Sequence, residues 1–239
     1  NHLLELLSLI AMNDPKENSP DSIRDEKVNV LKSVKNIDYK NNIVRGQYIK
    51  SKGRKGEQYN SYRSSEGVSN NSKTETYFAC KLFIENERWK DIPFFIRTGK
   101  RMPTKVTEIV MLFFRLQPDE GLLVKFNLKK PGKKNQLINK NLEFHYKNLS
   151  NEFNTNSYET LLLDIFNGDT MLFSRSDFVE MAWKIVDPIS EEIEKDNIKL
   201  YGYKSGTWGP KIADNLFRNE NTWRYPCKNL VNDGEICEL

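Results

Sequence analysis

The sequence has 239 residues, which fits one large domain or two small ones. Lysine and arginine total 37 against 33 aspartate and glutamate, and this net charge of +4 is too small to indicate a nucleic-acid-binding surface. No apolar run is long enough to span a bilayer, and no basic segment precedes the apolar N-terminal stretch. We therefore expect neither a transmembrane helix nor a signal peptide.

Scarce residue types exclude further classes. Cys80, Cys227 and Cys237 are too few for a disulfide scaffold and favour a reducing compartment, so we expect a cytoplasmic protein. His2 and His145 are the two histidines, and no histidine or cysteine has the spacing of a metal ligand, so no metal site is predicted. The sequence contains no G-x-G-x-x-G or P-loop motif, and this predicts no standard phosphate-binding loop.

The N-terminal region is predicted to be helical. Apolar residues at helical spacing predict a helix over 2–13, and Pro20 suits the first position of a second helix over about 21–35. From about residue 43 the apolar period changes to two, so NIVRGQYIK is predicted to be a strand. Residues 51–75 are rich in Ser, Asn, Gly and Lys, which indicates a long mobile surface loop.

A series of strands is predicted next. Segments rich in β-branched and aromatic residues, bounded by turn formers, cover 76–86, 91–99, 106–114, 121–129 and 141–147. No helical pattern separates them, so a largely antiparallel sheet is expected.

Two further helices are predicted after the strands. SYETLLLDIF is apolar on one side and stops at Asn167-Gly168, a favourable C-cap pair. Ser174 and Asp177 resemble a capping box for the next helix, which Pro188 should kink or end. The element order predicts an α+β fold with a large, mostly antiparallel sheet and helices packed on one side.

A basic cluster is the best local candidate for a binding site. In FFIRTGKRMPTK a predicted strand runs into a glycine turn, and Arg97, Lys100, Arg101 and Lys105 crowd its exit. Clustered cations at a strand end can hold a polar or anionic ligand. An ordinary basic turn between two strands is the alternative, and the residues alone favour it.

Other candidates are weaker. Arg115 and Gln117 alternate on one predicted strand, where they could share a ligand or form cross-strand pairs on a solvent face. His2 could act as a general base at neutral pH, although a lone histidine near a chain end is usually idle. His145 and Cys80 lie within predicted strands and are interpreted as structural.

Six ordered segments together resemble the C-terminal part of glucose-6-phosphate dehydrogenase. They are NHLLELLSLIAM, SIRDEKVNVLKSV, IVRGQY, FIENERWKDIPFFIRTGKRMPTKVTEIV, RLQPDEG and SYETLLLDIFNGDTMLFSRSDFVEMAW. The resemblance covers almost the whole chain, so residues 1–239 are expected to form the family's C-terminal β+α domain, which binds substrate and dimerises.

The resemblance implies an enzyme of the pentose phosphate pathway. The enzyme would catalyse the first step of that pathway, the oxidation of D-glucose 6-phosphate at C1 to 6-phosphogluconolactone with hydride transfer to NADP. The expected partners are glucose 6-phosphate, NADP and further copies of the chain, in a homodimer or tetramer formed through the sheet. A non-catalytic oligomerisation or binding fragment of such an enzyme is the alternative.

The resemblance also implies roles for single residues. His2 falls at the position of the catalytic base, while Lys100, Lys105 and Gln117 fall at substrate-contacting positions. Some members bind a second, structural NADP, whose contacts would fall on Arg97, Arg115, Lys125 and Glu143.

The second NADP site is incomplete in this sequence. Val106, Val110 and Trp208 replace cations that the resemblance leads us to expect, and three lost cations should weaken phosphate binding. Sheet-surface ion pairs are therefore an alternative role for the remaining basic residues.

Two departures from the family pattern stand out. The coenzyme-binding domain, the segment that grips the substrate phosphate and the acidic partner of the catalytic histidine are absent, so we expect a truncated chain that is inactive alone. The predicted strand 106–114 also passes into the next strand without a turn. Because antiparallel strands need a turn, residues are expected to be missing near Phe113-Phe114.

Overall fold

The structure is a computed structural model that describes residues 2–17, 19–53, 56–109, 114–117, 120–129, 137–148, 157–217 and 223–226. The chain divides into two compact units. Unit 1 contains residues 1–100, 155–204 and 209–220, and unit 2 contains residues 101–154, 205–208 and 221–239.

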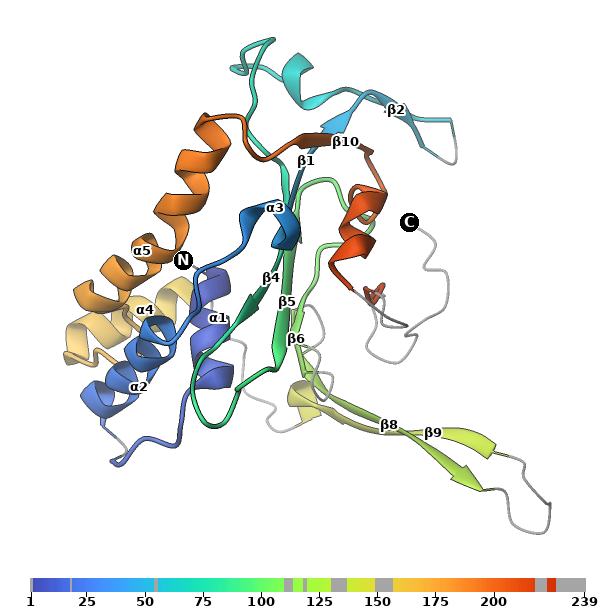
Figure 1. Cartoon of the computed structure of the whole chain (residues 1–239). Helices are drawn as coiled ribbons and strands as arrows, with labels where there is room; N and C mark the ends of the chain where they lie inside the picture. Colours follow the sequence, from blue (N-terminus) through green and yellow to red (C-terminus); the bar gives the residue numbers. More distant parts are fainter. Residues whose placement is uncertain are drawn as a thin grey trace. The chain divides into compact units, whose positions relative to one another are not determined.

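Unit 1 contains most of the helices (Figure 1). Its elements are α1 (His2–Ala11), α2 (Pro20–Lys32), α3 (Tyr39–Asn42), β1 (Ile43–Ile49), β2 (Ser51–Lys52), β3 (Gln58–Tyr59), η1 (Tyr62–Ser64), β4 (Tyr77–Phe83), β5 (Pro93–Gly99), α4 (Ser157–Asn167), α5 (Ser176–Glu194), β10 (Leu200–Lys204) and η3 (Lys211–Leu216). Unit 2 contains β6 (Thr107–Ile109), β7 (Phe114–Gln117), β8 (Gly121–Lys129), β9 (Leu137–His145) and η2 (Tyr146–Asn148).

The strands form a four-stranded sheet in each unit, and β2 pairs with β3 in a small ladder of their own. The sheet of unit 1 has the order β10-β1-β4-β5, and that of unit 2 has the order β6-β7-β8-β9. Only the β1–β10 pair is parallel among these described ladders. The predicted α+β class with mostly antiparallel strands is therefore confirmed, with the strands divided between two sheets.

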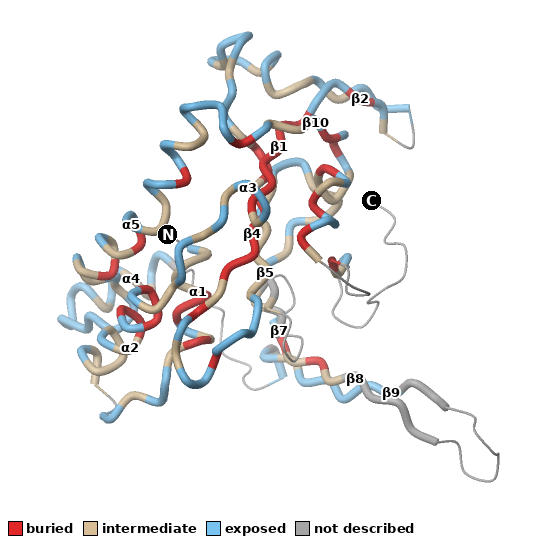
Figure 2. The backbone as a smooth tube through the Cα atoms, in the orientation of Figure 1, coloured by how far each residue is buried: buried red, intermediate tan, exposed pale blue. Residues whose placement is uncertain are grey.

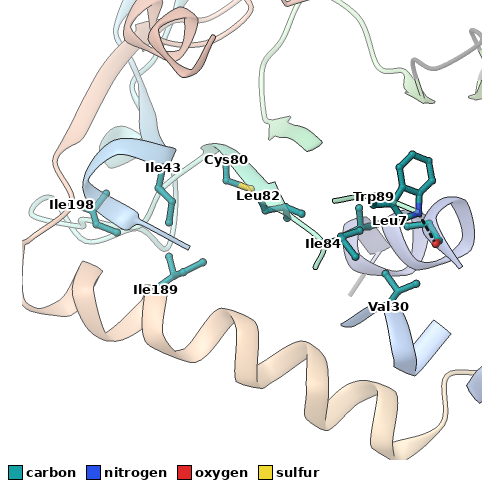
Figure 3. Packing of buried hydrophobic residues seen from close by; sticks show 10 residues of the cluster. Leu7, Val30, Ile43, Cys80, Leu82, Ile84, Trp89, Ile189 and Ile198 are labelled. Carbon is teal, nitrogen blue, oxygen red and sulfur yellow. Dashed lines mark hydrogen bonds between the residues drawn. The ribbon is translucent and has the colours of Figure 1, made fainter. Parts of the chain in front are cut away.

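The central strands of unit 1 are covered on both faces, so β1 and β4 consist mainly of buried residues (Figure 2). One face carries the main hydrophobic cluster, shown in Figure 3. Its buried members are Leu7, Ala11, Val30, Ile43, Cys80, Leu82, Ile84, Trp89, Ile189 and Ile198. The cluster joins α1, α2 and α5 to the sheet, and it confirms Cys80 as a core residue. Burial raises the pKa of the Cys80 thiol to about 12.

The opposite face of this sheet carries buried tyrosines. The rings of Tyr77 and Tyr203 lie 5.7 Å apart, and Tyr48 makes an edge contact with Tyr203 at 6.4 Å. A Cβ at Gly46 would lie 3.0 Å from the ring of Pro210, so the strand passes close to the segment that precedes η3. This packing explains why a glycine interrupts an otherwise apolar strand.

The strand β10 was not expected from the sequence, because Gly202 and Lys204 dilute its apolar pattern. A Cβ at Gly202 would lie 2.9 Å from the side chain of Ile49, so the glycine allows β1 and β10 to approach. Parallel pairing with β1, which lies far away in the chain, stabilises a segment whose local sequence is a poor strand former.

The helix boundaries agree in part with the predictions. The α2 helix begins as predicted at Pro20, and the Ser19 hydroxyl accepts the Ser22 amide at 3.3 Å. The predicted C-cap at Asn167-Gly168 is also confirmed, since Gly168 has φ +68° and the Asp169 amide donates to the Asp164 carbonyl at 2.8 Å.

One prediction about α5 is wrong and another holds at most in part. The capping box does not form, because the Ser174 hydroxyl donates to the Glu5 carboxylate and Asp177 pairs with Arg175. Pro188 was expected to kink or end the helix; it does not end it, since the helix continues to Glu194, and the kink stays a prediction. Burial of the next residue, Ile189, in the main cluster holds the second part of the helix against the sheet.

The predicted surface loop 51–75 contains β2, β3 and η1 and is tied to β1. The Gln47 amide donates to the carbonyls of Ser72 and Thr74 at 3.1 and 2.8 Å, and Arg63 donates to Gln47 at 3.0 Å. Gln47 is buried and needs hydrogen-bond partners, so the segment is held by polar contacts, contrary to the expectation of a mobile loop.

The predicted strand 106–114 is two strands, because β6 ends at Ile109 and β7 begins at Phe114. Residues 110–113 lie outside the described residues. The expectation that residues are missing from the sequence near Phe113-Phe114 therefore stays a prediction. Within the described part of the chain, no helix has both the length and the apolar character needed to cross a membrane.

Replacing Gly209 tests the packing around the tyrosine face. Gly209→Ala should lower the free energy of unfolding by about 3 kcal/mol, because Gly209 has φ +102° and a Cβ would lie 2.2 Å from the Tyr77 ring. Gly168→Ala is the matched control, since Gly168 has φ +68° but open space around it, and should cost about 1 kcal/mol. Urea unfolding measures both values, and equal losses would contradict the close approach.

Candidate functional site

His2 lies in the first turn of α1 and is exposed. The other end of this helix is firmly anchored: Leu7 and Ala11 are buried, and the Trp89 indole donates to the Ala11 carbonyl at 2.9 Å (Figure 3). The Ser8 hydroxyl also donates to the Leu4 carbonyl at 2.7 Å within the helix. The imidazole therefore extends from the solvent end of a rigidly held helix.

Lys100 follows directly after β5, and hydrogen bonds on both sides hold its backbone. Its amide donates to the Thr76 carbonyl at 2.8 Å, and its carbonyl accepts from the Tyr203 hydroxyl at 2.8 Å. The Thr76 hydroxyl lies 3.0 Å from the Tyr203 oxygen and accepts the Tyr48 amide at 3.0 Å. This network holds the backbone in place, while Lys100 as a residue is exposed.

Thr76 and Tyr203 are positioning residues that sequence reasoning missed. Both are buried, and burial raises the pKa of Tyr203. The alternation of Tyr201 and Tyr203 is the one sequence signal that could have indicated a strand there. Their link to Lys100 depends on a contact across 103 residues, which no local pattern predicts.

Arg97 pairs with Ala79 across β4 and β5, two residues before the Tyr77–Gly99 pair. Strand alternation places Arg97 on the same face as Tyr77. Burial raises the pKa of Tyr77 to about 12, the positive charge of Arg97 opposes this shift, and Asp214 adds to it. Arg97 therefore interacts with Tyr77 on the sheet face that carries Tyr48, Tyr77 and Tyr203. This contact within unit 1 is the alternative to a role in NADP binding.

Lys105 and Gln117 lie near the same end of the β6–β7 pair. Thr107 is the partner of Gln117 in the ladder, and Lys105 precedes Thr107 by two residues and is exposed. Pairing of β6 with β7 thus brings the backbones of the two residues proposed to contact substrate in unit 2 close together.

Arg115, Lys125 and Glu143 occupy backbone positions on one face of the unit 2 sheet. Arg115 pairs with Gly121, and Leu123 pairs with Glu143, so two-residue alternation connects these positions with that of Lys125. The register agrees with a shared ligand. It also agrees with pairs of side chains on the sheet surface, since Oε2 of Glu143 lies 3.6 Å from Nε2 of His145.

The predicted residues are divided between the units. His2, Arg97 and Lys100 belong to unit 1, whereas Lys105, Arg115, Gln117, Lys125 and Glu143 belong to unit 2. A surface pocket lined by Asn13, Asn86, Glu87 and Arg88 contains none of them. In the part of the chain that the structure describes, no group of three His, Cys, Asp or Glu side chains could hold a metal ion.

The fold and these residues define an α+β domain in which strand ends present lysines and one sheet carries mixed charges. A family profile described as "Glucose-6-phosphate dehydrogenase, C-terminal domain" matches residues 1–224. The chain belongs to this family, as the resemblance of its segments predicted.

Relatives and solved structures agree with the family. Glucose-6-phosphate 1-dehydrogenase of Treponema pallidum (strain Nichols) is 38% identical and aligns with 100% of the chain and 52% of its own length. The Aggregatibacter actinomycetemcomitans enzyme is 40% identical, over 95% of the chain and 50% of its own length. The chain therefore spans about half the length of these curated relatives.

Two solved structures share the fold. The crystal structure of glucose-6-phosphate 1-dehydrogenase from Mycobacterium avium has a TM-score of 0.78 at 30% identity, covering 95% of this chain and 49% of its own. A glucose-6-phosphate dehydrogenase in complex with its substrate glucose-6-phosphate has a TM-score of 0.79 at 31% identity, covering 92% and 50%.

Stability at high pH tests the burial of Tyr77. Its folded pKa of about 12 exceeds the ordinary value of 10.0, so its contribution is complete below pH 10 and is lost as the pH rises toward 12. The loss should reach about 2–3 kcal/mol. Urea unfolding between pH 9 and 12 measures it, and Tyr77→Phe should remove this part of the dependence. The buried Cys80 titrates in both proteins, so its effect cancels in the comparison. Identical pH profiles would contradict the burial of the phenol.

Proposed function

We propose that the chain is the substrate-binding and dimerisation domain of an NADP-dependent glucose-6-phosphate dehydrogenase. The full-length protein oxidises D-glucose 6-phosphate at C1 to 6-phosphogluconolactone, the first step of the pentose phosphate pathway. The observation that carries this proposal is the lysine at the end of β5, whose backbone is held by Thr76 and Tyr203, in a chain of this family. The solved relative that contains glucose-6-phosphate supports the choice of substrate.

The charges suit a phosphorylated sugar. Lys100 and Lys105 are exposed cations that follow β5, and cations of this kind form strong charge-assisted hydrogen bonds with phosphate and hydroxyl oxygens. Gln117 has an amide that can both donate to and accept from sugar hydroxyls. Lys105 and Gln117 of unit 2 are proposed to bind the sugar, and the resemblance gives the same role to Lys100 of unit 1.

His2 acts as the general base in this proposal. Its neutral imidazole accepts the proton of the C1 hydroxyl, so electron density can move to C1 as the carbonyl forms. NADP, when bound, supplies the acceptor for the hydride that leaves C1. The anchored end of α1 keeps the position of His2 constant relative to unit 1.

Within the chain, the residues proposed to contact a coenzyme are those of the second, structural NADP. The sequence has no glycine-rich phosphate loop, so the coenzyme that accepts the hydride is proposed to bind in the part of the relatives that precedes the matched region. Arg115, Lys125 and Glu143 share a sheet face in the backbone register of unit 2 and are the positions proposed to hold the structural NADP. Arg97 belongs to unit 1, so its proposed role toward this NADP rests on the resemblance alone. We also propose a cytoplasmic location, from the low cysteine content.

Replacing His2 tests the catalytic role. In the full-length protein, His2→Asn should lower kcat by about 10²- to 10⁴-fold while KM for glucose 6-phosphate changes little. The reason is that a general base accepts the proton in the transition state and contributes little to substrate binding. Absorbance of reduced nicotinamide measures the rate with NADP and, separately, with NAD. His145→Asn is the matched control and should leave the rate nearly unchanged. A wild-type protein without activity would favour the non-catalytic binding fragment.

The unit 2 sheet is the proposed contact between copies in a homodimer or tetramer. Leu142 and Tyr146 are exposed by 62% and 59%, and Phe144, between them, is exposed by 41%. β9 is also an edge strand, so its outer side has no neighbouring strand in the described sheet. Exposed apolar side chains on a strand at a sheet edge are typical of a protein–protein contact.

Placing charges among the exposed apolar side chains of β9 tests whether they form the contact between copies. Leu142→Asp combined with Phe144→Asp should shift the full-length protein toward monomer, because each carboxylate would have to be desolvated in the contact. Sedimentation velocity at several concentrations measures the shift. Ile49→Asp, at a residue of unit 1 with similar exposure to Phe144, should leave the assembly unchanged. An unchanged mass for the double variant would reject the strand as the contact.

A further inference from the structure

The helix α4 shows its apolar stripe to solvent. Tyr158, Leu162, Ile165 and Phe166 fall at positions i, i+4, i+7 and i+8, the spacing of the side of a helix that normally faces a core. Their exposed fractions run from 55% for Leu162 to 85% for Phe166. No described residue of α4 is buried, and the helix has no red segment in Figure 2.

The described residues of unit 1 leave the apolar stripe of this helix mostly exposed. An isolated helix of 11 residues is marginal in water, and most of its stability must come from packing of its apolar face. The loop after α4 extends the exposed apolar surface with Leu172, which is 62% exposed. We call these five residues, Tyr158, Leu162, Ile165, Phe166 and Leu172, the α4 face.

The loop that follows α4 is fixed to the two N-terminal helices, α1 and α2. Arg24 of α2 donates to the Thr170 carbonyl, and Arg175 pairs with Asp25 of α2. The Ser174 hydroxyl donates to Glu5 of α1. These contacts are formed within unit 1, so they hold the loop in place relative to the start of α1.

The start of the chain is therefore close to this loop. His2 precedes Glu5 by three residues, which is less than one turn of α1, and Leu4 packs against the cluster that contains Phe178 of α5. Any polypeptide joined to residue 1 begins about one helical turn from the contact between Glu5 and Ser174.

The relatives have such a polypeptide. The matched family profile is their C-terminal domain, and the chain aligns with 50% to 52% of the first two relatives. About half of each relative therefore lies outside the aligned region. A tethered domain has a high effective concentration at nearby surfaces, which favours its docking over that of a free partner.

We infer that the α4 face is the surface on which the N-terminal half of the full-length protein docks. This inference rests on the proposed function, because it takes the full-length protein to have the organisation of its relatives. Docking there buries the apolar stripe of α4 and covers the solvent end of α1.

A photo-cross-linker at position 166 tests the inference. In the full-length protein, Phe166 is replaced by p-benzoylphenylalanine, a close relative of the native ring, and the irradiated product is mapped by mass spectrometry. The expected link joins position 166 to a peptide upstream of residue 1 in a product of unchanged monomer mass. Placing the same cross-linker at Leu162 repeats the test if the first variant folds poorly.

The controls separate the other occupants. Ile92, which is 45% exposed in the turn before β5, is the matched control position and should give no such link. A product of doubled mass would assign the α4 face to a second copy. A link only within residues 1–239, or no more linking than at Ile92, would also overturn the inference. NADPH formation is measured on the same sample, so an inactive protein that still forms the expected link would reject the proposed activity and not the docking.

Discussion

The hydroxyl of Tyr203 is the contact on which the architecture of unit 1 depends. It donates to Lys100 and lies 3.1 Å from the Thr76 carbonyl, so it connects β10 to the start of β4 and the end of β5. Because the phenol is buried, these polar groups have no water to replace the bond. These bonds therefore fix the backbone at the exit of β5 relative to β10.

Burial on both faces of the unit 1 sheet has a second consequence. The helices cover one face with a dry apolar cluster, and the tyrosines with η3 cover the other. Polar groups inside this arrangement must be paired, which is why the buried Arg45 donates to the Ile198 carbonyl at 2.8 Å and to the Lys73 carbonyl at 3.0 Å. The 51–75 segment and the segment between α5 and β10 are held to the sheet by the same requirement.

Local pattern predicted the elements well where residue spacing is regular. The helices α1 and α2 follow from apolar stripes and β4 from a continuous buried run, while β5 and β8 follow from their β-branched and aromatic residues. Prediction was wrong where a distant partner changed the outcome. Ser174 has the spacing of a cap, but Glu5 takes its hydroxyl, and Pro188 has the character of a helix stop, but Ile189 is packed in the core.

The candidate site shows the same division. The residues at the exit of β5 were found from their charge, and the resemblance of six segments identified the family that the profile match shows. No pattern identified Thr76 and Tyr203, since their hydrogen bonds join segments that are far apart in the chain. The apolar side of α4 was also visible in the sequence, but periodicity cannot say whether such a stripe faces its own core or solvent.

By itself the sequence determined the family, the type of most elements and the basic character of the strand exit, because these depend on residue order and short-range spacing. Only the tertiary structure decided that the strands form two sheets, that β10 pairs with β1, and that Lys100 is held from β10. It also decided that the apolar stripe of α4 lies on the surface. The physical reason is that pairing partners and burial are set by contacts between distant segments, which the local sequence does not encode.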